Sequence, residues 1–148
     1  MTTTRSRKLF VNLAVKEVSR SIAFFRTLGF EFNPQFTTDT TACMVLSEEA
    51  YVMLLEEPRF RDFTSRDICD TSTQTEGLFA LSAESREEVD QLVQTALAHG
   101  GAPAQKPMDH GFMYGWSFYD PDGHHWEVFW MDPAAIQQQP AEADVASA

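Results

Sequence analysis

The stretch Asp120-Pro121-Asp122-Gly123-His124-His125-Trp126-Glu127-Val128 decides the fold of this 148-residue chain. Its Pro at the second turn position and its Gly at the fourth suit a type I turn. The turn joins a predicted strand over 114–119 to a final predicted strand over 124–130. Alternate residues of a strand point to the same face, so this strand predicts a shared face for three side chains. They are His125, Glu127 and Phe129.

Three further elements are predicted upstream of this hairpin. Residues 77–82 read as a strand, 85–99 as a helix and 102–106 as a short strand. Ser85, with Glu88 three positions on, fits the capping-box pattern of a helix start. The apolar face of this helix repeats at helical spacing. It consists of Val89, Leu92, Val93, Ala96 and Leu97.

The first half of the chain repeats the same order of elements. A strand over 10–15 precedes a helix over 17–28, which Gly29 is expected to end. Three strands follow, over 30–36, 41–47 and 51–56. The helix has a buried stripe at i, i+4 and i+7 spacing, made by Val18, Ile22, Phe25 and Leu28. The sequence therefore predicts an α+β fold made of two βαβββ modules.

The boundaries of these modules predict a single domain with short extensions. The segment between the modules is polar and long for a plain loop, so a mobile lid is one interpretation of it. The predicted parts are a flexible N-terminus over 1–7, a domain over 8–132 with modules 8–57 and 77–131 joined by linker 58–76, and a flexible tail over 133–148.

Composition excludes several classes of partner. The net charge is −11, from 11 Lys and Arg against 22 Asp and Glu. A nucleic-acid partner needs clustered basic residues, and an anionic membrane surface attracts them, so neither is expected. No apolar run approaches the length of a membrane span, and no signal-length apolar stretch follows the N-terminus. We therefore expect a cytoplasmic protein.

Cys43 and Cys69 form neither a CxxC pair nor a zinc spacing, so two reduced thiols are the simplest interpretation.

Phe supplies 12 of the 18 aromatic residues. A small domain with this much Phe can line both a core and an apolar ligand pocket.

Two segments at the correct ends of the duplicated module carry a family resemblance. They are Leu13-Ala14-Val15-Lys16-Glu17-Val18-Ser19-Arg20-Ser21-Ile22-Ala23-Phe24-Phe25 at the entry and the Asp120–Val128 segment at the exit. The chain resembles the vicinal oxygen chelate superfamily over about residues 8–131. That group includes glyoxalase I, bleomycin-resistance proteins, fosfomycin-resistance enzymes and extradiol dioxygenases.

A narrower likeness, to small bacterial proteins described as predicted lactoylglutathione lyases, comes from three other stretches. These are residues 10–13, 32–36 and 110–115. The superfamily resemblance implies an open, U-shaped, barrel-like sheet around a cleft, with helices outside, and a homodimer.

The resemblance also implies where a divalent metal would be bound. Metal-dependent relatives place ligands on the first and last strands of each module, which corresponds here to Phe10, about Leu54, Leu78 and Glu127. Only Glu127 has a lone pair suited to coordination. We therefore expect no cofactor, with a divalent metal bound through Glu127 as the weaker alternative. A lactoylglutathione-lyase activity is in doubt for the same reason, and extradiol cleavage more so.

Other residues are candidates for contacting a small molecule. Phe10, Asn12, Leu54 and Leu78 would line the cleft, together with His125 and Phe129. His110 would lie on the rim, or else be a solvated loop residue. Tyr114 shares a strand face with Trp116, and this face either lines the cleft or packs in the core.

Two functions follow from these residues. In the first, the protein binds a small apolar or cationic molecule, with Asn12 and Glu127 orienting it. In the alternative, it is a lyase-type enzyme of the glyoxalase class that acts on a small carbonyl or thiol adduct, with Glu127 as acid or base.

Overall fold

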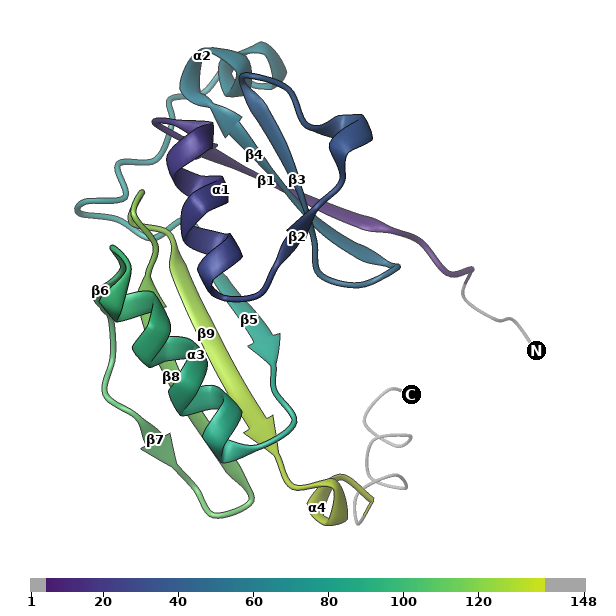
Figure 1. Cartoon of the computed structure of the whole chain (residues 1–148), viewed down its shortest axis with the longest axis vertical. Coiled ribbons are helices and arrows are strands. Elements are labelled where there is room, and N and C mark those ends of the chain that lie inside the picture. The colour runs from purple at the N-terminus through teal and green to yellow at the C-terminus, as the bar shows by residue number, and fades with distance from the viewer. Residues whose placement is uncertain (1–4, 138–148) are drawn as a thin grey trace. The chain divides into compact units, whose positions relative to one another are not determined.

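The computed structural model describes residues 5–137 and divides into two compact units, Met1–Gln74 and Thr75–Ala148 (Figure 1). Each unit contains one mixed sheet and one long helix, in the order that the sequence predicts. The α+β fold with two βαβββ-like modules is therefore confirmed.

The first unit pairs its strands in the order β1-β4-β3-β2. Strands β1 and β4 are parallel, and the other neighbours are antiparallel. After β4 the chain turns through two short helical segments into the inter-module segment. The elements are β1 (Leu9–Val15), α1 (Val18–Thr27), β2 (Glu31–Phe32), η1 (Pro34–Phe36), β3 (Thr41–Val45), β4 (Ala50–Glu56), α2 (Glu57–Phe60) and η2 (Arg61–Phe63).

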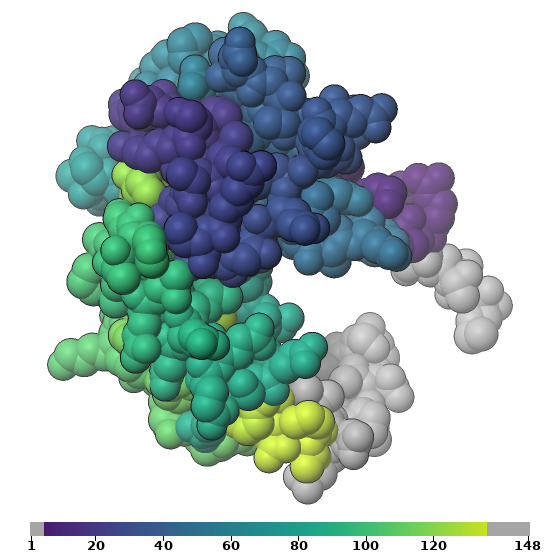
Figure 2. Space-filling model, viewed as in Figure 1, coloured from purple at the N-terminus to yellow at the C-terminus, as the bar shows by residue number. Residues whose placement is uncertain are grey.

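The second unit repeats this topology. Its sheet has the order β5-β9-β8-β6, with β5 parallel to β9, and a short strand β7 also pairs with β8. Helix α3 packs on β8 and β9 and lies on the surface seen in Figure 2. The elements are β5 (Leu78–Ser82), α3 (Arg86–Ala98), β6 (Ala102–Pro103), β7 (Met108–Asp109), β8 (Met113–Tyr119), β9 (His125–Met131) and α4 (Pro133–Gln137).

The start of α3 and the end of α1 follow the signals that the sequence contains. The Ser85 hydroxyl accepts the Glu88 N–H at 3.0 Å, and the Glu88 carboxylate accepts the N–H of Glu84. Gly29 follows α1 with φ +95°, a conformation that glycine adopts without strain. Val89, Val93 and Ala96 of α3 are fully buried.

The structure corrects several predicted boundaries. The strand predicted over 30–36 stops at Phe32, because Pro34 starts a short 3-10 helix that the Asn33 side chain caps. The strand predicted over 102–106 covers only Ala102–Pro103, and β7 was not predicted. Residues 138–148 of the predicted tail, and 1–4 of the predicted N-terminus, lie outside the described residues.

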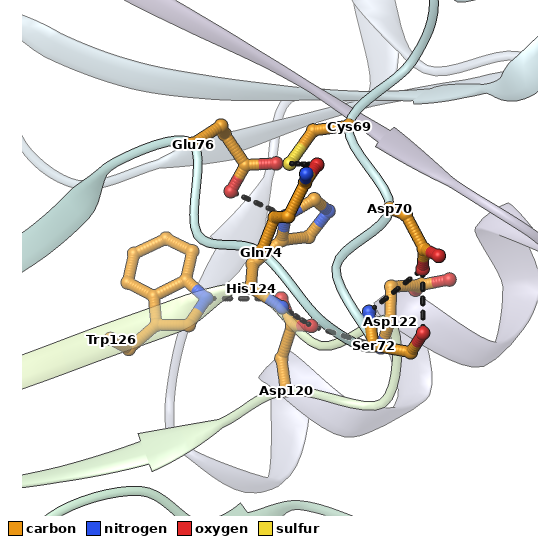
Figure 3. Close-up of polar contacts among 9 residues, drawn as sticks. All are labelled: Cys69, Asp70, Ser72, Gln74, Glu76, Asp120, Asp122, His124 and Trp126. Carbon is orange, nitrogen blue, oxygen red and sulfur yellow. Dashed lines mark hydrogen bonds and ion pairs between the residues drawn. The ribbon is translucent and has the colours of Figure 1, made fainter.

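A buried carboxylate organises the turn between β8 and β9 (Figure 3). Oδ1 of Asp120 accepts the N–H groups of Asp122 and His124, and Oδ2 accepts the Trp126 indole N–H at 3.0 Å. Nδ1 of His124 lies 3.3 Å from a carboxylate oxygen of Glu76. Burial raises the pKa of Asp120, while His124 and the donated hydrogen bonds oppose that rise. This network fixes the start of β9 and therefore the positions of the side chains along it.

We predict that Asp120→Ala lowers the free energy of unfolding by about 3 kcal/mol, because buried N–H donors then lose their acceptor. Asp120→Asn keeps one acceptor oxygen and should cost about half as much. Urea unfolding followed by Trp fluorescence measures both losses, with the exposed Asp39→Ala as control. A loss within about 0.5 kcal/mol of that control would contradict the role of Asp120.

Candidate functional site

One face of the second sheet is turned away from α3, and we call it the Glu127 face. Trp126 and Val128 are fully buried, because they point toward α3. Alternation along the strand therefore turns Glu127 to the other side. The strand register places eleven residues on the Glu127 face. They are Leu78, Ala80, Ser82, Met113, Gly115, Ser117, Tyr119, His125, Glu127, Phe129 and Met131.

A His–Glu pair lies in the middle of this face. Nε2 of His125 lies 2.5 Å from Oε2 of Glu127. The Tyr119 ring meets the His125 ring edge to face, with centroids 5.4 Å apart. The imidazole is buried, whereas about a third of the Glu127 side chain is exposed. The carboxylate is thus held by one neighbour and still open to a ligand.

The strand residues beside Glu127 on β5 and β8 are uncharged. Ala80 and Ser117 are its register partners on β5 and β8, and the Ser117 hydroxyl accepts the Gln105 N–H. Leu78, beside His125, is 64% exposed. Among the strand residues on this face, Glu127 is the only carboxylate, and there is no Lys or Arg. A carboxylate in an apolar and aromatic surface can orient a small molecule by a hydrogen bond or an ion pair.

The prediction that Glu127, His125 and Phe129 share a face is confirmed, and Leu78 joins them. Tyr119 was not named as a candidate from the sequence. Alternation along the strand nevertheless predicts that Tyr119 lies on the same face as Ser117, which is not the face of Tyr114. Its contact with His125 comes from the pairing of β8 with β9, which a single sequence does not reveal.

Tyr114 lies on the opposite side of the sheet, which settles the choice left open by the sequence. It pairs with Trp130 across the strands, and its hydroxyl donates to Asp90 of α3 at 2.5 Å. This hydrogen bond raises the pKa of Tyr114 to about 12. Tyr114 therefore belongs to the packing of α3 and does not contact the Glu127 face.

Arg86, at the start of α3, connects this helix to the hairpin between β7 and β8 by hydrogen bonds. It donates two hydrogen bonds to the carboxylate of Asp109 and a third to the Gly111 carbonyl. Its guanidinium also lies over the Tyr114 and Trp130 rings, 5.2 Å from each centroid. Arg86 holds the pKa of Asp109 down at about 2.

His110 lies at the tip of the hairpin between Asp109 and Met113. It is exposed, and its ring is 6.5 Å from that of Phe112. Its predicted role on the rim of a site stays a prediction.

In the first unit, Phe10 and Asn12 lie on the sheet face turned away from α1. The Phe10 ring stacks on the Tyr51 ring at 4.8 Å, and the Asn12 amide donates to the Phe10 carbonyl. Leu54 was placed with them from the sequence, and the register corrects this. It pairs with Leu13 and Ala42 and is fully buried on the other face.

The side chains at the implied metal positions do not fit a divalent ion. Phe10 and Leu78 offer no lone pair, and Leu54 points away from Phe10. Within residues 5–137, no group of three or more His, Cys, Asp or Glu is arranged to hold a metal. Glu127 and His125 contribute two donors, but these donors bind each other.

The comparison with family models settles the membership of the chain. The model described as "Glyoxalase/Bleomycin resistance protein/Dioxygenase superfamily" matches residues 9–128. The chain belongs to this superfamily. A search of curated proteins finds no match.

Several solved structures share the fold of the chain. A hypothetical protein, SA1046, from S. aureus is 29% identical, with a TM-score of 0.72 over 86% of this chain and 95% of that one. A glyoxalase/bleomycin resistance protein/dioxygenase family enzyme from Burkholderia phytofirmans is 16% identical, with a TM-score of 0.68 over 82% and 96%. The fosfomycin resistance protein FosX from Listeria monocytogenes is 20% identical, with a TM-score of 0.59 over 90% and 98%.

No helix within the described part of the chain has the length and apolarity to span a membrane.

The Arg86–Asp109 contact predicts a specific acid sensitivity. Because the folded-state pKa of Asp109 is about 2, below the ordinary value of 3.8, its ionised form stabilises the fold above about pH 4. That contribution should disappear as the pH falls from about 4 to about 2. A carboxyl-carbon NMR titration should show the midpoint near 2 in the native chain and a normal midpoint in Arg86→Ala. A normal midpoint in the native chain would contradict the contact.

Proposed function

We propose that the protein binds a small organic molecule on the Glu127 face of its second unit. The observation that carries the proposal is the partly exposed Glu127 carboxylate, held by His125 within a face whose other strand residues are uncharged. Aromatic and aliphatic side chains would supply contact area, and the carboxylate would orient the ligand. The ligand is apolar or cationic, because an anion would be repelled.

The proposal does not need a metal. Of the four implied ligand positions, only Glu127 carries a ligating atom, since the other three are occupied by Phe10, Leu54 and Leu78. The ligand would be held by apolar contact area and by one carboxylate. Both come from side chains that lie on the Glu127 face. A homodimer and a cytoplasmic location stay predictions.

A second function is favoured by the contact between His125 and Glu127. A carboxylate in hydrogen-bond contact with an imidazole can act as acid or base in proton transfer. The narrower likeness to predicted lactoylglutathione lyases suggests a small carbonyl or thiol adduct as substrate. In that case Glu127 would be the catalytic residue and His125 the residue that positions it.

The binding proposal predicts that blocking the Glu127 face abolishes ligand binding. Ala80 is exposed and lies beside Glu127 in the register, so Ala80→Trp should fill the space next to the carboxylate. A small-molecule screen by thermal shift, followed by titration of the hits, should show at least about tenfold weaker binding in this variant.

The matched control is Ala98→Trp, because Ala98 is exposed at the end of α3, the helix on the other side of the same sheet. It should bind as the native protein does. Equal loss in both variants, or none in either, would count against the Glu127 face as the site.

The enzymatic alternative predicts a different outcome for Glu127→Gln. If Glu127 transfers a proton, kcat/KM for the hemithioacetal of methylglyoxal should fall by about 10²–10⁴. If the native protein has no turnover while it binds ligands on the Glu127 face, the alternative is wrong and the binding function stands.

A further inference from the structure

Three thioethers and one imidazole gather at one end of the Glu127 face, on strands β8 and β9 and on the hairpin that begins with β7. We propose that this methionine cluster binds a soft monovalent metal ion, Cu(I) or Ag(I). Its donors are Met113, Met131, His110 and Met108. The site goes beyond the proposed function, since it uses neither the Glu127 carboxylate nor an organic ligand.

The strand register brings the four side chains together. Met113 of β8 lies directly opposite Met131 of β9. On the other side of Met113, the pairing of β7 with β8 continues for one more residue, because the His110 N–H donates to the Met113 carbonyl at 2.8 Å. Met108 pairs with Gly115, two residues after Met113, and is therefore diagonal to it. Met113 is thus the common neighbour of the other three donors.

The donors share one side of the sheet and are within reach of one another. Register partners share a side, which puts Met108 on the Glu127 face. Alternation turns His110 to the same side and Asp109 to the other, where its carboxylate binds Arg86. Side chains directly opposite each other have Cβ atoms about 5 Å apart, and diagonal ones about 7–8 Å. Methionine can bridge such gaps because it is unbranched and has three rotatable bonds.

The hairpin that carries Met108 and His110 is fixed to the rest of the unit. Arg86 donates three hydrogen bonds to it from the start of α3. The Phe112 carbonyl accepts the N–H of Asp132, directly after β9, at 2.7 Å. The donors on the hairpin and the donor at the end of β9 are therefore held near each other before an ion binds, which lowers the entropic cost of binding.

The cluster is open to solvent. Met108 is 53% exposed, and the His110 side chain is exposed as well. Met113 and Met131 are half-buried, unlike the fully buried methionine of the first unit, Met44. An ion can therefore reach the sulfur atoms without opening the core.

The donor set indicates which class of ion is bound. Thioether sulfur is a soft, uncharged ligand that selects Cu(I), and imidazole also suits copper. Hard ions such as Mg²⁺ and Ca²⁺ need oxygen ligands, which none of the four side chains supplies. Ag(I) has the same charge as Cu(I) and is likewise soft, so it serves as a second probe.

The charge of the second unit favours a cation at this site. Residues 1–74 contain nine Lys or Arg and ten Asp or Glu, whereas residues 75–148 contain two and twelve. The net charges are therefore −1 and −10, which together give the −11 of the whole chain. Uncharged donors in a negative field attract a cation without first having to lose a proton.

The test must exclude binding by the two thiols. Cys69 is a free and only half-buried thiol that would compete for a soft ion, so every measurement uses the Cys69→Ala chain. Cys43 is buried, and burial raises the pKa of its thiol, which keeps it protonated. Ag(I) is added as the nitrate in chloride-free buffer, and Cu(I) is kept reduced by ascorbate without oxygen.

The first measurement follows the methionine methyl groups by NMR, with no change to any methionine. One equivalent of Ag(I) should shift the methyl signals of Met108, Met113 and Met131. Met44 and Met53 belong to the first unit and should keep their signals, so they are the internal reference.

The second measurement compares affinities for Cu(I) by competition with bicinchoninate. Met113→Leu and Met131→Leu remove the sulfur lone pairs while nearly conserving side-chain volume. Each should weaken binding by at least about tenfold, the loss that even an outer-shell partner of a metal can cause. His110→Phe keeps a ring without nitrogen and should also weaken binding. The matched control is Met53→Leu, a half-buried methionine of the first sheet, which should bind as the parent chain does.

The outcomes decide the proposal even if a variant does not fold. Methyl signals of the cluster that do not move with Ag(I), or that move no more than those of the first unit, overturn it. Affinity for Cu(I) that is unchanged in folded Met113→Leu and Met131→Leu also overturns it.

A last variant separates the cluster from the metal position that the superfamily resemblance implies. Glu127 is four residues from Met131 along β9, about 13 Å away. Glu127→Gln should therefore bind Cu(I) as the parent chain does. Loss of Cu(I) binding in Glu127→Gln, with binding kept in the two Leu variants, would place the ion at Glu127 and contradict the proposal. The small-molecule function is tested separately by Ala80→Trp and does not depend on these results.

Discussion

The burial of Trp126 and Val128 beneath α3 is the constraint on which the second unit depends. Since side chains alternate along a strand, fixing these two residues on one side sends His125, Glu127 and Phe129 to the other. A register slip of one residue would bury the Glu127 carboxylate against α3 and expose the indole. The Asp120 turn prevents such a slip, because its carboxylate binds the Trp126 indole N–H and the backbone of the turn together.

The sequence predicts most of the fold because its signals are local. Helical spacing in α3, the Ser85 cap and the Asp120–Gly123 turn each use interactions within a few residues. The failures have local causes as well. Pro34 ends a predicted strand early, since it starts a 3-10 helix capped by Asn33. The strand β7 has only two residues, too few for any periodicity.

The candidate site is predicted only in part, for a physical reason. Alternation gives the neighbours of Glu127 on its own strand, so His125 and Phe129 follow from the sequence. Residues on other strands depend on register, which long-range pairing sets. This is why Leu54 was placed on the wrong side of the first sheet and why Tyr119 was not named. Arg86 was also missed, because its partner Asp109 lies 23 residues away.

Membership of the glyoxalase/bleomycin resistance/dioxygenase superfamily supplies a scaffold, but the chemistry depends on the side chains present. In this chain those side chains form an apolar face with one carboxylate and one imidazole, in the unit that carries nearly all the net negative charge. A small apolar or cationic ligand, as proposed above, would use the apolar side chains for contact area and the Glu127 carboxylate for orientation.

The most direct test is an amide chemical-shift map of the native protein with benzyltrimethylammonium, a small organic cation of the class that the binding proposal names. The account predicts shifts centred on Ala80, Ser117 and Glu127, with α3 residues such as Val93 unaffected. Shifts centred on α3 or on the first unit, with the Glu127 face unchanged, would contradict it.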